Sequence, residues 1–519
     1  MGVLNLVEKV RQQAFEQPEK TAYYFLGKGT TYGELEHTIA TFAAALQDLG
    51  VQKGDHIAFL LGNTPHYIIS LYASMRIGAT AIPINPIYTA DEISYIIKNG
   101  DVKVVIALDM LLPLVEAGVQ GFPQVIKYIV CETSPDVADK YATLSDAAKA
   151  KTTLFTQVLA TTSRTVDPVE VQPDDTAIIL YTSGTTGQPK GAMLTHNNLY
   201  SNARDVGEYL KMSSDDRVIA TLPVFHVFAL TVVVNAPLTQ GATLLLAPRF
   251  SPGEIFELAA AYKATVFAGV PTMFNFLYQY EPGNVEAFSN LRLAISGGAS
   301  LPVSLLHNFE QKFNVRISEG FGLSEASPVT CFNPIDRERK AGSIGQSIIN
   351  VENKIVDENG EEVPVGEVGE LIVRGPNVMK GYYKMPEETA VAIRNGWLYT
   401  GDLARKDEED YFYIVDRKKD LIIVGGYNVY PREVEEVLFS HNGIVEAAVV
   451  GFPDPNFGEA VHAYVVLKDP AVSIEEIKEY CAKHIAKYKV PTVIEILDEL
   501  PKNTTGKILR RSLKQTAKI

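Results

Sequence analysis

Short apolar stretches alternate with amphipathic segments of helical periodicity along most of the chain. The stretches 57–61, 79–85 and 102–108 have the composition of buried strands. Between them, the segments 65–77 and 89–100 have the periodicity and end signals of helices. Parallel strands need long crossover connections, which are usually helical, so this alternation predicts a doubly wound sheet.

The same alternation resumes beyond residue 196. A helical segment at 196–210 leads into apolar strands, and the chain from 253 to 280 has the order helix, strand, helix. A strand at 291–296 is then followed by a helix at 302–313. The two series predict an α/β N-terminal domain in which two doubly wound sheets pack together. The interval 131–170 is weakly patterned, and we expect a surface excursion there.

The pattern changes at about residue 342. From there to about 415, valine-rich strands are separated by glycines, which predicts an antiparallel β subdomain. A charged segment at 416–420 has the composition of a linker and precedes a stretch of about 100 residues, which is domain-sized. We therefore predict an N-terminal domain at 1–416 and a small α+β C-terminal domain at 417–519.

The composition restricts the ligands that the chain can bind. With 47 basic and 62 acidic residues among 519, the formal net charge is −15. This charge argues against nucleic-acid binding and against a polybasic membrane surface, so local groups would have to hold an anionic ligand. The hydrophobic content of 46% and the charged content of 21% are those of a soluble globular protein.

Cysteine usage and apolar segments bear on the compartment. Cys131, Cys331 and Cys481 are scattered, so neither a disulfide framework nor a zinc site is predicted, and a reduced cytoplasmic compartment fits best. The N-terminus lacks the features of a secretory signal. The most apolar region, 224–238, is interrupted by polar residues, so we expect a buried core segment and no transmembrane segment. Peripheral membrane contact and the oligomeric state are left open.

A glycine-rich loop follows the predicted buried strand at 176–180. The segment 181–191 is YTSGTTGQPKG. Glycines let backbone N–H groups surround an anion, the hydroxyls add donors, and Lys190 adds a full positive charge. The spacing of a Walker A loop is absent. A solvated turn between a strand and a helix is the simplest alternative, but the hydroxyls, the lysine and the preceding strand together favour phosphate binding.

Two more segments combine glycines with groups that suit a nucleotide. In SGGASLP, which follows a predicted strand, Gly297 and Gly298 would let a flat ring approach the backbone. EGFGLSEASP places Phe321 between two glycines, with Ser324 and Glu325 close behind. Such an aromatic side chain can stack on a base, and a carboxylate is a suitable ligand for Mg²⁺.

Three charged residues lie further along the chain. Asp402, in YTGDLA, can accept hydrogen bonds from two ribose hydroxyls, and Arg417 could brace the same ribose. Lys507 follows a polar turn in PKNTTGKILR. Taken singly, each has a simpler explanation, such as a capping aspartate, a solvated arginine or a surface lysine.

Together, and in this order, the motifs resemble those of the adenylate-forming superfamily of acyl-CoA synthetases, luciferases and peptide-synthetase adenylation domains. The resemblance covers about residues 20 to 512, and both the loop at 181–191 and the PKxxxGK motif at 501–507 are complete. It implies that a carboxylate attacks the α-phosphate of ATP, with Mg²⁺ as cofactor, to give an acyl-adenylate and pyrophosphate. A thiol, usually that of coenzyme A, then takes the acyl group and releases AMP.

The resemblance also implies residue roles. The phosphates of ATP are held by Thr182, Ser183, Gly184, Thr185, Thr186, Gly187 and Lys190. Adenine is cradled by Gly297, Gly298, Ala299, Gly320, Phe321 and Gly322, and ribose is held by Asp402 and Arg417. Ser324 and Glu325 serve phosphate and metal, with Glu325 as the Mg²⁺ ligand. Lys507 steadies the carboxylate and α-phosphate oxygens.

In the family the C-terminal domain rotates about a hinge between the two half-reactions. The matching hinge region is 416–420, with Lys419 at the hinge position. Gly425, Gly426 and Tyr427 would then line the path of coenzyme A, where the missing Cβ atoms leave room for pantetheine.

The segment LPVFHVFAL resembles the acyl pocket of the family, with His226 as a gate or carboxylate-side residue. The predicted walls are Val227, Phe228, Val270, Thr272 and Met273. No charged group among them would select a charged tail, so an apolar acyl chain is favoured. The motifs are most similar to those of bacterial medium- to long-chain fatty acid–CoA ligases.

Three other functions remain open at this point. The nearest is an aryl- or short-chain acyl-CoA ligase on the same scaffold, and the next is an enzyme that loads an acyl group onto a carrier protein. The third is a nucleotide-binding regulator without catalysis, against which the presence of Lys507 and Glu325 argues.

Overall fold

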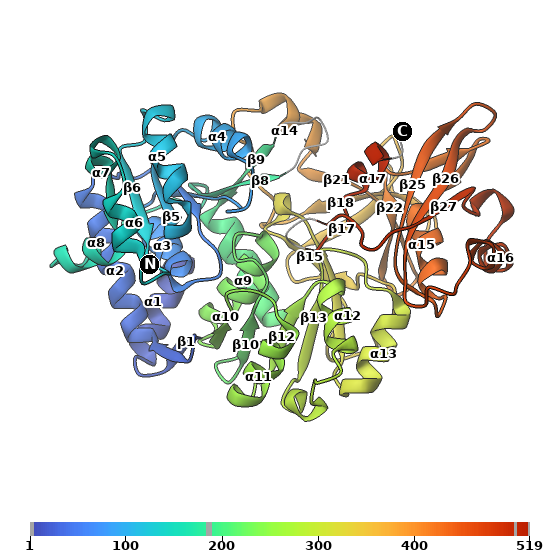
Figure 1. The fold of residues 1–519 in the computed structure, drawn as a ribbon, viewed down its shortest axis with the longest axis horizontal. Helices are drawn as coiled ribbons and strands as arrows, with labels where there is room; N and C mark the ends of the chain where they lie inside the picture. Colours follow the sequence, from blue (N-terminus) through green and yellow to red (C-terminus); the bar gives the residue numbers. More distant parts are fainter. Residues whose placement is uncertain (1–4, 183–188, 503–505, 517–519) are drawn as a thin grey trace.

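The structure is a computed structural model that describes residues 5–182, 189–502 and 506–516. Two large sheets with helices make up the N-terminal part, a smaller antiparallel sheet follows, and a sheet with helices ends the chain (Figure 1). This confirms the predicted α/β class, with its β subdomain and its α+β C-terminal unit.

The first large sheet is parallel from β8 to β7 and ends in antiparallel strands at the other edge. In spatial order its strands are β19 (Gly381–Tyr382), β9 (Lys190–Thr195), β8 (Thr176–Thr182), β4 (Thr80–Pro83), β3 (His56–Leu60), β5 (Val102–Leu108), β6 (Lys127–Cys131) and β7 (Thr152–Leu154). One face is buried by α4 (Ala90–Asn99) and α5 (Leu112–Gly121).

The second large sheet is parallel in its centre and antiparallel at both ends. Its strands are β16 (Gln346–Ser347), β15 (Val329–Phe332), β14 (Ile317–Gly322), β13 (Leu293–Ser296), β12 (Val266–Gly269), β10 (Arg217–Ala220), β11 (Thr243–Leu246), β1 (Thr21–Phe25) and β2 (Lys28–Thr31). One apolar core extends between the two sheets, which explains why their strands are nearly continuous apolar runs.

Helices fill the space around and between these sheets. They are α1 (Leu6–Glu16), α2 (Tyr32–Asp48), α3 (Pro65–Arg76), α9 (His196–Tyr209), α10 (Ala236–Thr239), α11 (Pro252–Tyr262), α12 (Pro271–Gln279) and α13 (Val303–Phe313). The apolar region 224–238 is buried, as predicted, and contains a π-helix at Ala229–Asn235. Thr89 caps α4 in a capping box with Glu92, so the local start signal in the sequence was sufficient.

The smaller sheets follow the predicted change of pattern. The antiparallel subdomain contains β17 (Glu352–Val356), β18 (Gly369–Arg374), β20 (Ile393–Arg394), β21 (Trp397–Lys406) and β22 (Phe412–Arg417), beside α14 (Pro386–Ala392). The C-terminal unit contains β23 (Ile422–Val424), β24 (Tyr427–Val429), β25 (Ile444–Asp454), β26 (Gly458–Leu467), β27 (Val493–Ile496), α15 (Pro431–Phe439), α16 (Ile474–His484) and α17 (Arg510–Thr516). Its apolar core is a cluster of its own.

The interval 131–170 differs from the predicted surface excursion. It contains α6 (Val137–Ala142), α7 (Asp146–Lys151) and α8 (Phe155–Thr161), and its strand β7 extends the first sheet beyond β6. Helices of six or seven residues bury only one or two side chains each, so they leave too little periodicity to detect.

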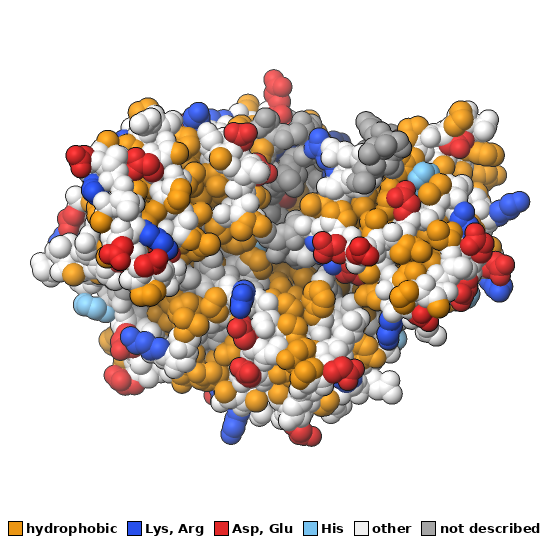
Figure 2. Space-filling model, viewed as in Figure 1, with side chains coloured by type: hydrophobic (Ala, Val, Ile, Leu, Met, Phe, Trp, Pro, Cys, Tyr) orange, Lys and Arg blue, Asp and Glu red, His pale blue; other side chains and the backbone are white. Residues whose placement is uncertain are grey.

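The glycine-rich loop also has a different setting from the strand-to-helix turn considered as its alternative. It leaves β8 and is followed by β9, which pairs antiparallel with β8. No helix among the described residues is long and apolar enough to cross a bilayer. Acidic and basic side chains are interspersed over the face drawn in Figure 2.

Candidate functional site

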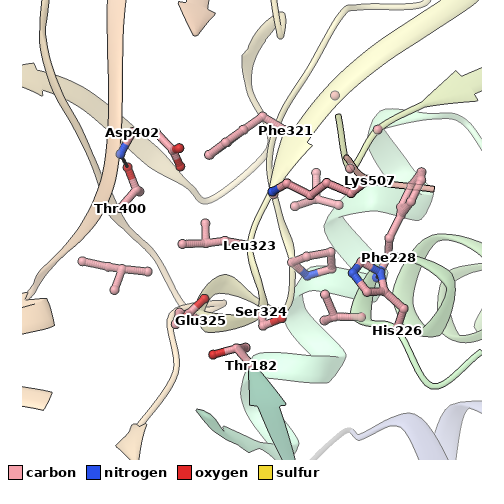
Figure 3. Close-up of a pocket in the computed structure, with 18 of the residues that line it drawn as sticks. Thr182, His226, Phe228, Phe321, Leu323, Ser324, Glu325, Thr400, Asp402 and Lys507 are labelled. Atoms are coloured by element: carbon pink, nitrogen blue, oxygen red, sulfur yellow. Dashed lines mark hydrogen bonds between the residues drawn. The ribbon is translucent and has the colours of Figure 1, made fainter. Parts of the chain in front are cut away.

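A cavity of about 420 Å³ lies where both large sheets, the antiparallel subdomain and the C-terminal unit meet. The predicted site residues that line it are Thr182, Lys190, His226, Val227, Phe228, Val270, Gly297, Gly298, Gly320, Phe321, Gly322, Ser324, Glu325, Asp402, Arg417, Lys419 and Lys507. Residues more than 300 positions apart in the sequence thus share one site (Figure 3).

The position of the cavity follows from the sheets. Thr182 ends β8, Gly297 comes directly after β13, and Phe321 lies near the end of β14. Ligands of open α/β sheets bind outside the carboxyl ends of the strands, where backbone groups are unpaired and loops converge. Gly298 has a φ of +79°, a left-handed conformation that favours glycine at this turn.

The structure describes two of the residues predicted to bind phosphate. Thr182 and Lys190 lie opposite each other at the ends of β8 and β9, and both line the cavity. Ser183, Gly184, Thr185, Thr186 and Gly187 lie outside the described residues.

Glu325 lies near this end, in a short turn of helix at Ser324–Ala326. Its Oε1 accepts a hydrogen bond of 2.9 Å from the hydroxyl of Tyr382. Burial raises the pKa of Tyr382, and the neighbouring Glu325 carboxylate raises it further, so the phenol keeps its proton and is the donor.

Asp402 and Arg417 meet across two neighbouring strands. They are paired in the register of β21 with β22, and Arg417 Nε lies 3.1 Å from Asp402 Oδ1. Burial raises the pKa of Asp402, while the positive charge of Arg417 lowers it. The Asp402 backbone N–H donates to the Thr400 hydroxyl at 3.1 Å, which fixes the turn before the carboxylate. A buried carboxylate that keeps a negative charge is suited to accept hydrogen bonds from hydroxyl donors.

Lys507 enters the cavity from the C-terminal unit. The residue before it, Gly506, has a φ of +78°, and a Cβ there would lie 3.2 Å from Val270 Cγ2. The hydroxyl of Thr272 donates to the Gly506 carbonyl at 3.3 Å. In Figure 3 the Lys507 side chain extends into the cavity, with its ammonium on the side towards Asp402. Burial lowers the pKa of Lys507 to about 8, and the positive charge of Arg417 contributes to this lowering.

The opposite end of the cavity is apolar. Val227, Phe228 and Val270 are buried there, and the Phe228 ring lies against Gly297, where a Cβ would be 3.2 Å from Cζ. His226 is the polar group of this end: its Nδ1 accepts from the Phe228 backbone N–H at 3.3 Å. Burial lowers the pKa of His226 to about 4, and the charge of Lys507 lowers it as well. The neutral ring therefore carries its proton on Nε2.

Several predicted residues lie away from the described cavity lining. Ala299 follows Gly298 but does not reach it, and Met273 is buried in the core. Thr272 instead contacts the Lys507 loop. Gly425 and Gly426 form an exposed turn between β23 and β24, and Tyr427, also exposed, begins β24. Lys419, predicted as a hinge residue, lines the cavity.

The structure adds lining residues that the sequence did not indicate, including Tyr88, Tyr181, Leu323, Tyr382 and Thr400. Tyr382 lies on a strand of two residues that pairs with β9, about 190 positions earlier in the chain. Pairing at such a separation leaves no local signal. Thr400 lies within the motif YTGDLA, two residues before Asp402, so that motif was the available signal.

Comparison with known proteins identifies the family of the chain. The AMP-binding enzyme family matches residues 10–383, and the AMP-binding enzyme C-terminal domain matches residues 433–507. The chain belongs to the AMP-binding enzyme family.

Its relatives within this AMP-binding enzyme family include ligases for different acids. A long-chain-fatty-acid–CoA ligase of Bacillus subtilis is 40% identical over 518 residues, which cover 96% of this chain and 91% of the relative. A feruloyl-CoA synthase of Amycolatopsis sp is 33% identical over 513 residues, covering 97% of each chain. The ATP-bound structure of MatB from Rhodopseudomonas palustris superposes with a TM-score of 0.86 at 33% identity, covering 99% of each chain.

Proposed function

We propose that this AMP-binding enzyme is an acyl-CoA ligase that activates a fatty acid as its acyl-adenylate and transfers it to coenzyme A. The observation that carries the proposal is the cavity itself. Lys507, Glu325 and the Asp402–Arg417 pair face the same space as an apolar end with one neutral histidine. This arrangement suits a nucleotide on one side and an uncharged acyl chain on the other.

In the first half-reaction, a carboxylate oxygen of the acid attacks the α-phosphorus of ATP. The bond from that phosphorus to the oxygen bridging the β-phosphate breaks, and pyrophosphate leaves with the electron pair. In the second, the thiol sulfur attacks the acyl carbon, its proton passes to water, and the bond to the AMP oxygen breaks. Both steps bring anions together, so charge neutralisation and positioning dominate the catalysis.

The described residues would divide this work by charge. Lys190 and Thr182 would contact the phosphates, and Asp402 with Arg417 would hold the ribose hydroxyls. Lys507, which is charged below a pH of about 8, would neutralise the carboxylate and α-phosphate oxygens as they approach. His226 would donate its Nε2 proton to the acid, since its low pKa keeps the ring neutral.

Mg²⁺ fits the site as the partner of ATP. Among the described residues there is no cluster of three or more His, Cys, Asp or Glu side chains that could hold a metal alone. Mg²⁺ typically uses one or two carboxylates together with substrate phosphates and water, and Glu325 supplies such a carboxylate at the phosphate side. When bound, the ion would neutralise phosphate charge.

The arrangement of the C-terminal unit supports an adenylation state. Lys507 reaches the cavity, while Gly425, Gly426 and Tyr427 are exposed elsewhere. The ATP-bound structure of MatB superposes with a TM-score of 0.86 and the ligand-free structure of the same protein with 0.77. The thiolation step would need a rotation about 416–420, with Lys419 at the hinge, which would bring the glycine turn towards the thiol.

The apolar end of the cavity and the long-chain-fatty-acid–CoA ligase relatives favour a fatty acid as the substrate. An aryl acid is the second candidate, because the feruloyl-CoA synthase relative covers the chain to the same extent. Cys131, Cys331 and Cys481 are all buried free thiols, which suits a reducing, cytoplasmic location.

A substrate panel tests this proposal. AMP and pyrophosphate release would be measured with acids from acetate to oleate and with substituted benzoates, with either coenzyme A or a holo-carrier protein as acceptor. We expect the highest kcat/KM with fatty acids of medium to long chain and with coenzyme A. A preference for benzoates or acetate would favour the second candidate, and AMP release with none of the acids would overturn the proposal.

A further inference from the structure

The short segment around Tyr382 connects two charged residues, Lys190 and Glu325, that come from different sheets. Both line the end of the cavity proposed to bind the nucleotide, which we call the nucleotide end. Backbone N–H groups on either side of Tyr382 donate to carbonyls of β9 at 2.8 and 2.9 Å, directly beyond Lys190. Earlier in the segment, the Met379 N–H donates to the Glu325 carbonyl at 2.8 Å. The main chain around β19 therefore connects the strand that carries Lys190 to the turn that carries Glu325.

The Tyr382 side chain makes the same connection. Its hydroxyl donates to Glu325 Oε1 at 2.9 Å, and the Lys190 ammonium lies 5.4 Å from the centre of its ring. The ring lines the cavity, between a carboxylate and a cation. A phenol can orient both groups without cancelling either charge, because its hydroxyl is a neutral donor and its face attracts a cation.

The surrounding backbone fixes this tyrosine independently of any ligand. Its N–H donates to the Thr389 hydroxyl on α14 at 2.8 Å. The residue before it, Gly381, has a φ of +147°, and a Cβ there would lie 2.7 Å from Thr389 Cγ2. Close contact with α14 and pairing with β9 therefore set the position of the ring, and the charged groups are arranged around it.

We propose that Tyr382 is a positioning residue, which holds the Glu325 carboxylate towards the metal and the Lys190 ammonium towards the phosphates. The inference rests on the proposed function, since it takes MgATP as the ligand. Tyr382 itself would act through its two neighbours. Residues that orient a metal ligand typically change metal affinity by about 10- to 100-fold when removed.

The test compares Tyr382→Phe, which keeps the ring and loses the hydroxyl, with Tyr382→Leu, which loses both. Tyr383→Phe is the matched control, because the Tyr383 hydroxyl donates to Asp101 at 2.7 Å and the residue is not among those lining the described cavity. ATP binding would be titrated at rising Mg²⁺ and in EDTA, without acid or coenzyme A. Mn²⁺ binding with ATP present would be followed by electron paramagnetic resonance.

We expect Tyr382→Phe to weaken metal binding by about tenfold while leaving the affinity for ATP in EDTA unchanged. Tyr382→Leu should also weaken ATP binding in EDTA, because the Lys190 ammonium loses its contact with the aromatic ring. In a Glu325→Gln background, Tyr382→Phe should cause no further loss of metal affinity, since it acts through that carboxylate.

Wild-type metal affinity in Tyr382→Phe, or an effect that adds fully to that of Glu325→Gln, would overturn the inference. Two substitutions are used so that failure of one to fold leaves the other informative. The readout is binding without turnover. An enzyme that activates no carboxylic acid would therefore overturn the proposed function alone and leave this measurement intact.

Discussion

The two ends of the cavity are built from different kinds of interaction. At the nucleotide end, Asp402 and Arg417 form an ion pair across neighbouring strands, and Glu325 accepts a hydrogen bond from Tyr382. At the acyl end, Val227 and Phe228 are buried apolar side chains that define space by shape. The nucleotide end selects its ligand by charge and by the direction of hydrogen bonds, whereas the acyl end selects its ligand by the volume of the apolar space.

This difference explains why the chemistry is more sharply defined than the substrate. A site built to hydrogen-bond a ligand rejects one that leaves its buried polar groups unpaired, by about 10⁴- to 10⁵-fold. An extra or missing methylene in an apolar pocket changes binding by only about 1–3 kcal/mol. Substitutions at the two ends should therefore differ in the kind of effect and in its size.

The largest effect is expected from Lys507→Ala. Loss of the charge proposed to neutralise the α-phosphate should lower the rate of acid-dependent ATP–pyrophosphate exchange by about 10²- to 10³-fold, as when an oxyanion donor is removed. Thioester formation from added acyl-adenylate and coenzyme A should be retained. Unchanged exchange, or equal loss of both half-reactions, would contradict the division of roles.

Lys419→Pro tests the proposed hinge role of Lys419 separately from its position in the cavity lining. The substitution restricts the backbone at 416–420, so we expect thioester formation from acyl-adenylate to fall on the order of tenfold while exchange is retained. Because Lys419 also lines the cavity, Lys419→Ala is the matched control for its side chain. If the alanine variant lost as much thiolation as the proline variant, the hinge assignment would be wrong.

Phe228→Ala tests the acyl end. Its ring lies against Gly297, so its removal should open space and shift kcat/KM by several-fold towards bulkier acids, with the KM for ATP unchanged. Phe→Ala in a core typically costs about 3–5 kcal/mol of stability, so folding must be checked. Phe225→Ala, on the same segment but outside the described lining, is the control. A change in ATP affinity without a change in acid preference would argue against a wall role.

Near neutral pH, the smallest effect is expected from a change of pH itself. The pKa of Lys507 is lowered to about 8, and the charged form is the one that exists below that value. The kcat/KM of adenylation should therefore be level near neutral pH and fall by about tenfold per unit well above pH 8. His226, with a pKa of about 4, should add no step near neutrality. A profile of Lys507→Arg that keeps the same fall would assign it to another group.

Much of the nucleotide end could be predicted because its residues belong to short motifs. Gly297 and Phe321 lie at or near the end of a strand, and this local setting is visible in sequence. Asp402 lies in the middle of β21, so its motif YTGDLA was the signal. The pairing of Asp402 with Arg417 could be expected as well, since a short hairpin connection separates their strands.

The rest of the site depends on contacts between distant segments. Tyr382 reaches Glu325 only because β19 pairs with β9. Thr272 was assigned to the acyl pocket, yet it contacts the Lys507 loop, because the direction of side chains on the first turn of α12 depends on packing. The apolar residues that line a pocket have no characteristic spacing in the sequence, so the acyl end is the part of the site that the sequence predicts least.

The central claim is that the nucleotide end activates the acid through AMP, whichever acid the other end admits. It is tested by supplying a fatty acid labelled with ¹⁸O in its carboxylate, together with MgATP and coenzyme A, and measuring the mass of the nucleotide and phosphate products. Attack on the α-phosphorus predicts one labelled oxygen in AMP and none in pyrophosphate. Label in inorganic phosphate, or unlabelled AMP beside newly formed acyl-CoA, would contradict the account.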